Sequence, residues 1–155
     1  MQREDEGFTK AVICRIKAPL LSNIIRVIVM DNLKAYLMSF ALGAVIYGLI
    51  EVIVRGYTHW TMALAGGLVM VIFLFISRNT NLGLLSRCLI GALVITAIEF
   101  TFGMIVNVGL GWNVWDYSHK PFNVFGQICP QFTAAWFFLS IPAFSLTDRL
   151  GELLS

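Results

Sequence analysis

Four long apolar stretches, separated by charged residues, constrain the fold of this chain more than any other feature. A helix needs about 20 apolar residues to cross the hydrocarbon core of a bilayer. Only 13% of the residues are charged, against about 25% in an average soluble domain. We therefore predict an all-α integral membrane protein whose residues 32–147 form four transmembrane helices, arranged as two hairpins. The predicted helices cover residues 35–54, 58–77, 88–110 and 122–146.

The positions of Lys and Arg predict how these helices are oriented. Nine of the 11 lie before the first stretch, between the second and third, or after the fourth, and only Arg55 and Lys120 lie in the other two connections. Positive residues accumulate in cytoplasmic segments. We therefore expect a multi-pass protein of the cell membrane with both termini in the cytoplasm. The connections near residues 55–59 and 111–121 would then face outward.

The terminal regions are predicted to be cytoplasmic, with residues 1–31 forming an N-terminal region and residues 148–155 a tail. After Pro19, the polar residues Ser22, Asn23 and Arg26 share one helical face, and apolar residues cover the rest. This pattern is typical of an amphipathic helix lying in the membrane interface.

Composition also excludes several classes of function and partner. The net charge of +2 is too small to indicate a nucleic-acid partner. The three cysteines, Cys14, Cys88 and Cys129, show no CxxC or zinc-finger spacing. We expect no metal and no other cofactor, and we expect membrane lipids as the immediate surroundings.

Two glutamates lie inside the apolar stretches, at matching positions. Residues 42–51 and 90–99 share Gly, Ala, Ile and Glu when aligned, which places Glu51 and Glu99 48 positions apart. A carboxylate at membrane depth costs a few kcal/mol and is a functional-site hypothesis by default. The offset is consistent with a parallel repeat of two hairpins. We therefore expect Glu51 and Glu99 to converge in one polar cluster.

Other polar residues are predicted to join these glutamates in the outer half of the protein. Arg55 lies one turn after Glu51, where a Glu–Arg pair is favourable. Asn123 and Gln127 are expected in the first turns of a fourth helix that begins after Pro121. The predicted ligand-binding set is Glu51, Arg55, Glu99, Trp115, Asp116, Tyr117, Ser118, Asn123 and Gln127.

The connection before the fourth helix is expected to fold back over the bundle. Trp115 and Tyr117 are large aromatic residues that are costly to leave exposed in a short loop. Asp116 between them needs hydrogen-bond donors, for which Arg55, Asn123 and the first backbone amides of the fourth helix are the candidates.

Simpler structural interpretations of the same residues stay open. Glu51 and Arg55 can form a purely structural ion pair, and Asp116 can form an Asx turn that holds the loop. Glu99 can be a protonated carboxyl that is hydrogen-bonded inside the bundle, with Asn123 or Gln127 as its partner. The small residues Ala44, Gly48, Gly66 and Gly67 are expected to allow close helix packing.

Several motifs together resemble those of the bacterial family called "putative ABC-transporter type IV", or CmpB-like. They are Arg55-Gly56-Tyr57, Glu99-Phe100-Thr101, Trp115-Asp116-Tyr117-Ser118 and Pro121-Phe122-Asn123. The resemblance covers most of residues 40–140 and implies a small multi-helix membrane protein with a transporter-like role. It points to Glu51, Glu99, Trp115–Ser118, Asn123 and Gly126 as the family's characteristic positions. The Pro-Tyr-Gly-like segment usual in the family is replaced here by residues 60–67.

Three classes of function fit these observations. The first is a permease-like protein that binds or passes a small solute at an outward-facing polar site between the first, third and fourth helices. The others are a structural or regulatory membrane subunit without a ligand, and a membrane-embedded acid–base enzyme acting on a lipid-like substrate. This chain has no Walker motif, so an ATPase would be a separate subunit. Four helices are few for alternating access, so we expect a homo- or hetero-oligomer.

The predicted orientation can be tested by cysteine labelling on intact cells. Single cysteines at Thr58 and His119, in a background without the native cysteines, should react with an impermeant thiol reagent, because both positions are expected outside. A cysteine at Thr80 should react only after the cells are permeabilised. The reverse pattern would place the termini outside the cell.

Overall fold

The structure is a computed structural model that describes residue 30 and residues 32–154 of the 155-residue chain. The interfacial helix expected within residues 1–31, and Cys14, therefore lie outside the described residues. The described part contains four helices and no strand, which confirms the all-α prediction. They are the helix Asn32–Arg55, α2 (Trp60–Asn79), α3 (Leu84–Gly103), which continues as the π-helical turn η1 (Met104–Gly109), and α4 (Pro130–Leu153).

Three of these helices are long and apolar enough to cross a membrane. They are Asn32–Arg55, Trp60–Asn79 and Leu84–Gly109, and they correspond to the first three predicted stretches. Within the described residues, α4 does not belong to this group. The prediction that a fourth membrane helix completes two hairpins therefore stays a prediction, as does the orientation of the bundle in the membrane.

The predicted start of the fourth helix was wrong. Residues 122–129 form turns, and α4 begins at Pro130 and continues to Leu153. Phe122, Phe125 and Gly126 have φ angles of 57°, 51° and 69°, which an α-helix cannot accommodate. Pro130 occupies the first helical position of α4, where its missing N–H costs nothing.

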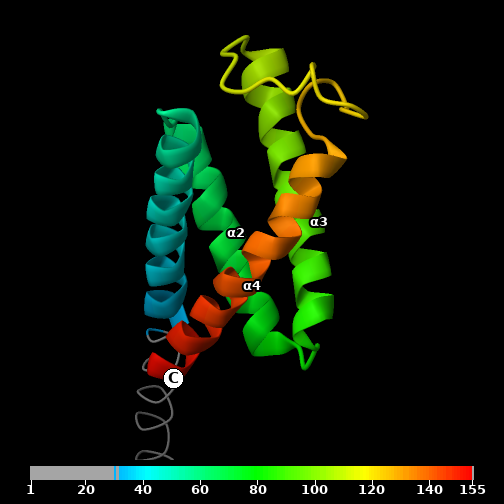
Figure 1. Cartoon of the computed structure of the whole chain (residues 1–155). Helices are drawn as coiled ribbons and strands as arrows, with labels where there is room; N and C mark the ends of the chain where they lie inside the picture. The colour runs from blue at the N-terminus through cyan, green and yellow to red at the C-terminus, as the bar shows by residue number, and fades with distance from the viewer. Residues whose placement is uncertain (1–29, 31, 155) are drawn as a thin grey trace, which may run out of the picture.

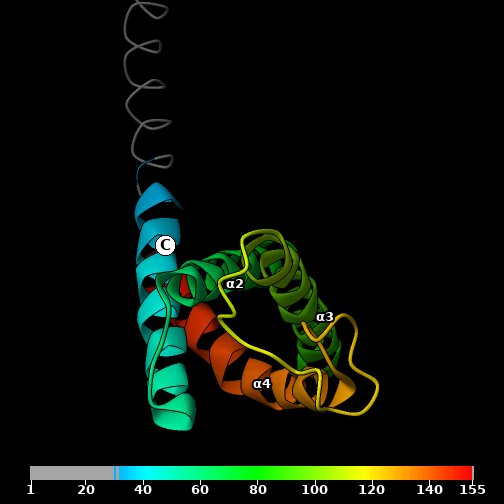
Figure 2. The same cartoon turned by 90° about the horizontal axis from the view of Figure 1, so that it is seen from above.

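The helices form a bundle in which α4 crosses the others obliquely (Figure 1). The connection at residues 56–59 and the long connection at residues 110–129 lie at one end, which we call the loop end. The connection between α2 and α3 and the C-terminus lie at the opposite end, which we call the terminal end. Seen from the loop end, residues 110–129 pass over α2, α3 and α4, while the helix Asn32–Arg55 lies beside α2 (Figure 2).

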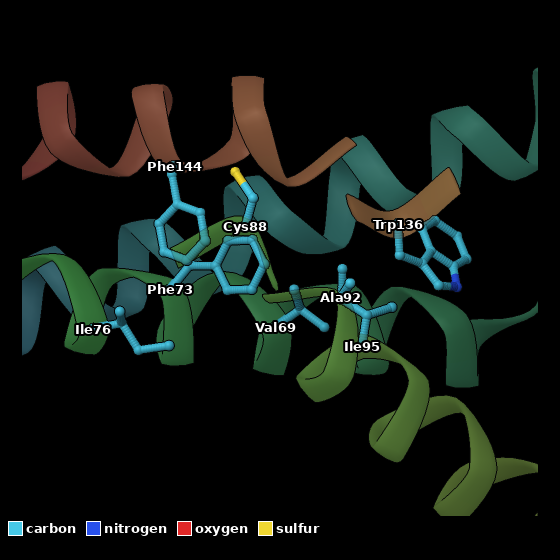
Figure 3. Packing of buried hydrophobic residues seen from close by; sticks show 8 residues of the cluster. All are labelled: Val69, Phe73, Ile76, Cys88, Ala92, Ile95, Trp136 and Phe144. Atoms are coloured by element: carbon cyan, nitrogen blue, oxygen red, sulfur yellow. The ribbon is translucent and has the colours of Figure 1, made fainter. Parts of the chain in front are cut away.

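The main hydrophobic core joins α2, α3 and α4. The rings of Phe73 and Phe144 stack in parallel, with their centroids 4.1 Å apart. Gly91 on α3 permits this contact, because a Cβ there would lie 2.8 Å from both the Phe73 ring and the Ser140 hydroxyl. The buried members of the core are Val69, Phe73, Ile76, Cys88, Ala92, Ile95, Trp136 and Phe144 (Figure 3).

Glycines bring the helix Asn32–Arg55 unusually close to α2. A Cβ on Gly66 would lie 2.3 Å from the Cβ of Tyr47, and one on Gly67 would lie 2.6 Å from the Phe40 ring. The predicted packing role of Gly66 and Gly67 is therefore confirmed. Their counterpart on the first helix is Gly43, whose added Cβ would lie 2.4 Å from the Gly66 carbonyl oxygen.

An ion pair fastens α3 to α4 at the terminal end. The Arg87 guanidinium donates two hydrogen bonds to the Asp148 carboxylate, at 2.8 and 3.0 Å. It also donates to the Ser77 hydroxyl on α2 at 3.2 Å. Bidentate Arg–carboxylate pairs combine strength with fixed geometry, so this contact sets the angle at which α4 leaves the bundle.

Adding a single methyl group at Gly66 should loosen the first helix from α2. We expect Gly66→Ala to lower the free energy of unfolding by about 1–3 kcal/mol, the usual cost of overpacking. Gly48→Ala is the matched control, because Gly48 also lies inside a helix and the nearest atom to a Cβ there would be the Thr58 hydroxyl oxygen at 4.0 Å. Titration of detergent-solubilised protein with a denaturing detergent measures both values, and equal values would contradict this account of the interface.

Candidate functional site

Glu51 is held in an ion pair at the loop end of the first helix. Its carboxylate accepts hydrogen bonds from the Arg55 guanidinium at 2.6 Å and from the Thr58 hydroxyl at 2.9 Å. Arg55 also donates to the Tyr57 hydroxyl at 2.8 Å and to the backbone carbonyl of Val114. The pair expected from the i, i+4 spacing is therefore present, and it ties the first helix to the long connection.

Glu99 is the most deeply buried carboxylate among the described residues, with 3% of its surface exposed. The Trp136 indole N–H donates to it at 2.7 Å, and the Tyr47 hydroxyl donates to it at 3.4 Å. The expectation that Asn123 or Gln127 would be its partner was wrong. Because α4 begins only at Pro130, it is Trp136 that reaches the level of Glu99.

The two glutamates belong to separate hydrogen-bonded groups. The donors to Glu51 are Arg55 and Thr58, whereas the donors to Glu99 are Tyr47 and Trp136. Tyr47 lies one turn before Glu51 on the same helix, so the first helix carries Glu51 together with a donor to Glu99. The two carboxylates share no hydrogen-bond donor, so the single polar cluster expected from the sequence is not formed, and Arg55 pairs with Glu51 but not with Glu99.

A third buried polar group organises the long connection around Asn107. The Asn107 amide donates to the Trp115 carbonyl at 3.0 Å and to the Gln127 side-chain oxygen at 2.7 Å. Its own oxygen accepts the Val114 N–H at 2.7 Å. The Gln127 side-chain amide in turn donates a hydrogen bond to the Phe125 carbonyl at 2.8 Å. Asn107 lies on η1, and π-helical turns often accompany functional positions.

Trp115 folds back into the protein, as the sequence predicted. Only 5% of its surface is exposed, and it packs with Met62, Val106 and Val114. Its indole N–H donates to the Gln127 carbonyl at 3.0 Å. Tyr117 is partly buried and stacks on Phe132 of α4, with ring centroids 4.4 Å apart. The connection is therefore a packed cover on the loop end.

Asp116 and Asn123 stabilise turns within this cover. Asp116 is exposed and accepts hydrogen bonds from the Ser118 N–H at 2.7 Å and the Ser118 hydroxyl at 2.9 Å. These bonds favour the charged form and hold the pKa of Asp116 below its usual value. Asn123 donates to the carbonyls of Ser118 and Lys120 and accepts the Gly126 N–H. The expectation that Arg55 or Asn123 would be the donor to Asp116 was wrong, and the Asx-turn interpretation is the one that the geometry supports.

A cavity of about 170 Å³ is lined in part by Tyr47 and Trp136, the two residues that donate hydrogen bonds to Glu99. Its walls include the rings of Tyr47 and Trp136, which stack with centroids 5.7 Å apart. The remaining lining comes from apolar residues of all four helices. None of the nine residues in the predicted ligand-binding set lines this cavity.

Three important residues escaped prediction: Tyr47, Asn107 and Trp136. Asn107 could have been found as a second strongly polar residue, after Glu99, in the third apolar stretch. Trp136 lies in the middle of the fourth stretch and away from an interface, and a buried indole N–H needs an acceptor. No comparable sequence signal marks Tyr47, whose role depends on the close packing of two helices.

The described residues contain no group of three or more His, Cys, Asp and Glu side chains that could hold a metal ion. Cys88 and Cys129 are both buried free thiols. Cys129 lies at the N-cap of α4, and it makes no side-chain capping hydrogen bond.

Long apolar helices that bury hydrogen-bonded carboxylates define a helical membrane protein. The chain belongs to the family described as "Putative ABC-transporter type IV", whose family model matches residues 51–152. This match begins at Glu51 and extends over α2, α3, the long connection and nearly all of α4. Comparison with curated proteins and with solved structures finds no match.

Removing the Asn107 amide should open the long connection. In Asn107→Ala the Val114 N–H and the Trp115 carbonyl lose their partner, and each buried polar group left unpaired costs about 1–3 kcal/mol. We expect a loss of about 3 kcal/mol in the free energy of unfolding, together with a red shift of Trp115 fluorescence. Asn79→Ala, at an exposed amide, is the control. A loss no greater than that of the control would show that Asn107 does not hold the cover.

Proposed function

We propose that this protein is a membrane-embedded subunit of a transport system and that it binds a small, largely apolar solute beside Glu99. The family assignment supports a role in transport. The observation that carries the proposal is the cavity whose walls include Tyr47 and Trp136, the two donors to Glu99. The site is therefore shifted away from the polar loop residues toward the centre of the bundle.

The cavity favours a solute with an apolar body and one hydrogen-bond donor. An apolar cavity of about 150 Å³ in another protein stays dry and binds benzene, so the volume here suits an aromatic ring or a short alkyl chain. The bond from Tyr47 to Glu99 is 3.4 Å long, whereas O–H···O hydrogen bonds usually measure about 2.5–3.0 Å. An ammonium group on the solute would replace this weak donor and pair with the carboxylate.

The long connection would act as the cover of this site. Tyr47 packs against the cluster formed by Met62, Val106, Val114 and Trp115. Arg55 and Asn107 hold the same connection through the carbonyls of Val114 and Trp115. Solute exchange from the loop end would therefore require these bonds to open. Because the chain has no Walker motif, the ATPase of such a system would be a separate subunit.

A second candidate is a structural or regulatory subunit that binds no solute. This candidate is favoured because the buried polar side chains already form hydrogen bonds within the protein. Among the described residues, Arg87 Nε is the only buried side-chain nitrogen or oxygen atom without a hydrogen-bond partner. No ligand is thus required to satisfy the carboxylates, and under this alternative Glu51 and Glu99 serve to join helices.

Two matched probes separate these candidates. We expect 2-phenylethylamine to raise the melting temperature of the purified protein and to change Trp136 fluorescence, whereas 3-phenylpropionate, with the opposite charge, should do neither. A ligand at 100 times its Kd stabilises the folded state by about 2.7 kcal/mol. Glu99→Gln should abolish the effect, and Asp116→Asn, at an exposed carboxylate, should retain it. If the amine and uncharged toluene both leave the melting temperature unchanged, the structural role is favoured and the binding proposal fails.

A further inference from the structure

The first turn of α4 lies opposite the middle of α3, well below the loop end. The hydroxyl of Thr133, the fourth residue of α4, lies 3.0 Å from the hydroxyl of Thr96. Thr96 is midway along the membrane-crossing helix Leu84–Gly109. The non-helical residues 121–129 therefore descend beside the half of α3 nearer the loop end, as Figure 1 shows. The ring centroids of Phe125 and Phe100 lie 6.5 Å apart. Because Phe100 is on the membrane-crossing helix Leu84–Gly109, this contact places the segment at membrane depth.

A groove of about 470 Å³ is lined in part by this non-helical segment. It lies between α3, the segment 121–129 and the first turns of α4. Its volume falls within the range of about 300–1,000 Å³ that is typical of ligand sites. Its main walls are Leu89, Leu93, Phe122, Val124, Ile128 and Phe137. It shares no lining residue with the cavity lined by Tyr47 and Trp136.

Water is a poor occupant of this groove. A buried water needs two to four polar partners. The one hydroxyl in the lining belongs to Thr133, and it is already bonded to Thr96 and to the Cys129 carbonyl. The rim is apolar as well, because Leu89 and Leu93 are each 58% exposed and Phe122 is 86% exposed. Leu89 and Leu93 lie on a helix long and apolar enough to cross a bilayer, where exposed side chains face the hydrocarbon chains of lipids.

A lysine precedes the groove-lining segment in the sequence. Lys120 is two residues before Phe122, and its side chain forms no ion pair with any described residue. The Asp116 carboxylate accepts its hydrogen bonds from Ser118, and among the described residues it forms no ion pair with Lys120. A lysine at this level can extend its ammonium group toward a lipid phosphate.

We infer that the groove binds one acyl chain of an anionic phospholipid whose headgroup contacts Lys120. The chain fills the apolar space left where α4 starts late, and the phosphate pairs with the free ammonium group. The segment 121–129 is thereby packed on one side by protein and on the other by a resident lipid. This inference does not depend on the proposed solute site.

The acyl-chain site can be tested with a phosphatidylglycerol that carries a diazirine in its acyl chain, incorporated with the protein into nanodiscs. After illumination, labelled residues mapped by mass spectrometry should concentrate in residues 89–93 and 122–137. Leu37 and Ile53 on the first helix, at 61% and 82%, are more exposed than Leu89 and Leu93 of the groove, at 58% each, and should nevertheless carry less label. Label distributed in proportion to exposure over all helices would overturn the inference.

Variants sharpen the test. Ala134→Trp, at an exposed residue lining the groove, should reduce groove labelling about tenfold, equivalent to about 1.4 kcal/mol. Ala41→Trp, at an exposed residue of the first helix, should not reduce it. If Ala134→Trp does not fold, the distribution of label on the wild-type protein still decides between a specific acyl-chain site and uniform contact with lipid.

The headgroup is tested separately with a phosphatidylcholine that carries the same diazirine chain. The anionic lipid should label the groove about fivefold more strongly, the order of effect expected for one lysine near a membrane surface. Lys120→Gln should remove this preference and leave labelling by phosphatidylcholine unchanged. Equal labelling by both lipids in the wild-type protein would overturn the assignment to an anionic lipid.

Discussion

The segment between η1 and α4 leaves the helical conformation, and its buried backbone N–H and C=O groups must find partners within the protein. Amide side chains supply these partners, because one amide can donate and accept at the same time. Asn107 serves Val114 and Trp115, while Asn123 and Gln127 serve carbonyls of the segment itself. Asn123 and Gln127, which the sequence predicted to line a solute site, therefore stabilise the irregular backbone of this segment.

The late start of α4 determines much of the remaining architecture. It places Trp136, and neither Asn123 nor Gln127, at the level of Glu99. It also leaves space beside α3 for an apolar groove. At the terminal end, the pair between Arg87 and Asp148 fixes where α4 finishes. One oblique helix is therefore held by a tryptophan–carboxylate bond near its start and an ion pair near its end.

The two glutamates meet the cost of burial in different ways. Glu51 is paired with a guanidinium and a hydroxyl at the end of its helix, so its charge is locally balanced. Glu99 has only neutral donors, one of them at 3.4 Å, and both donors line an apolar cavity. This difference supports the proposal of a solute site near Glu99, whereas Glu51 anchors Arg55 and the loop that Arg55 holds.

Hydropathy and local spacing determined the all-α class, the first three apolar helices, the Glu51–Arg55 pair and the burial of Trp115. These features depend on residues close in sequence or on the cost of exposing a single side chain, which a sequence records directly. The start of α4 could not be derived in this way, because residues 122–129 are apolar enough for a helix, and the positive φ angles of Phe122 and Phe125 are invisible in composition. Tertiary packing decided the partners of Glu99, the role of Asn107 and the two apolar hollows. Each requires helices distant in sequence to meet at a particular height and angle, and only the folded chain sets both.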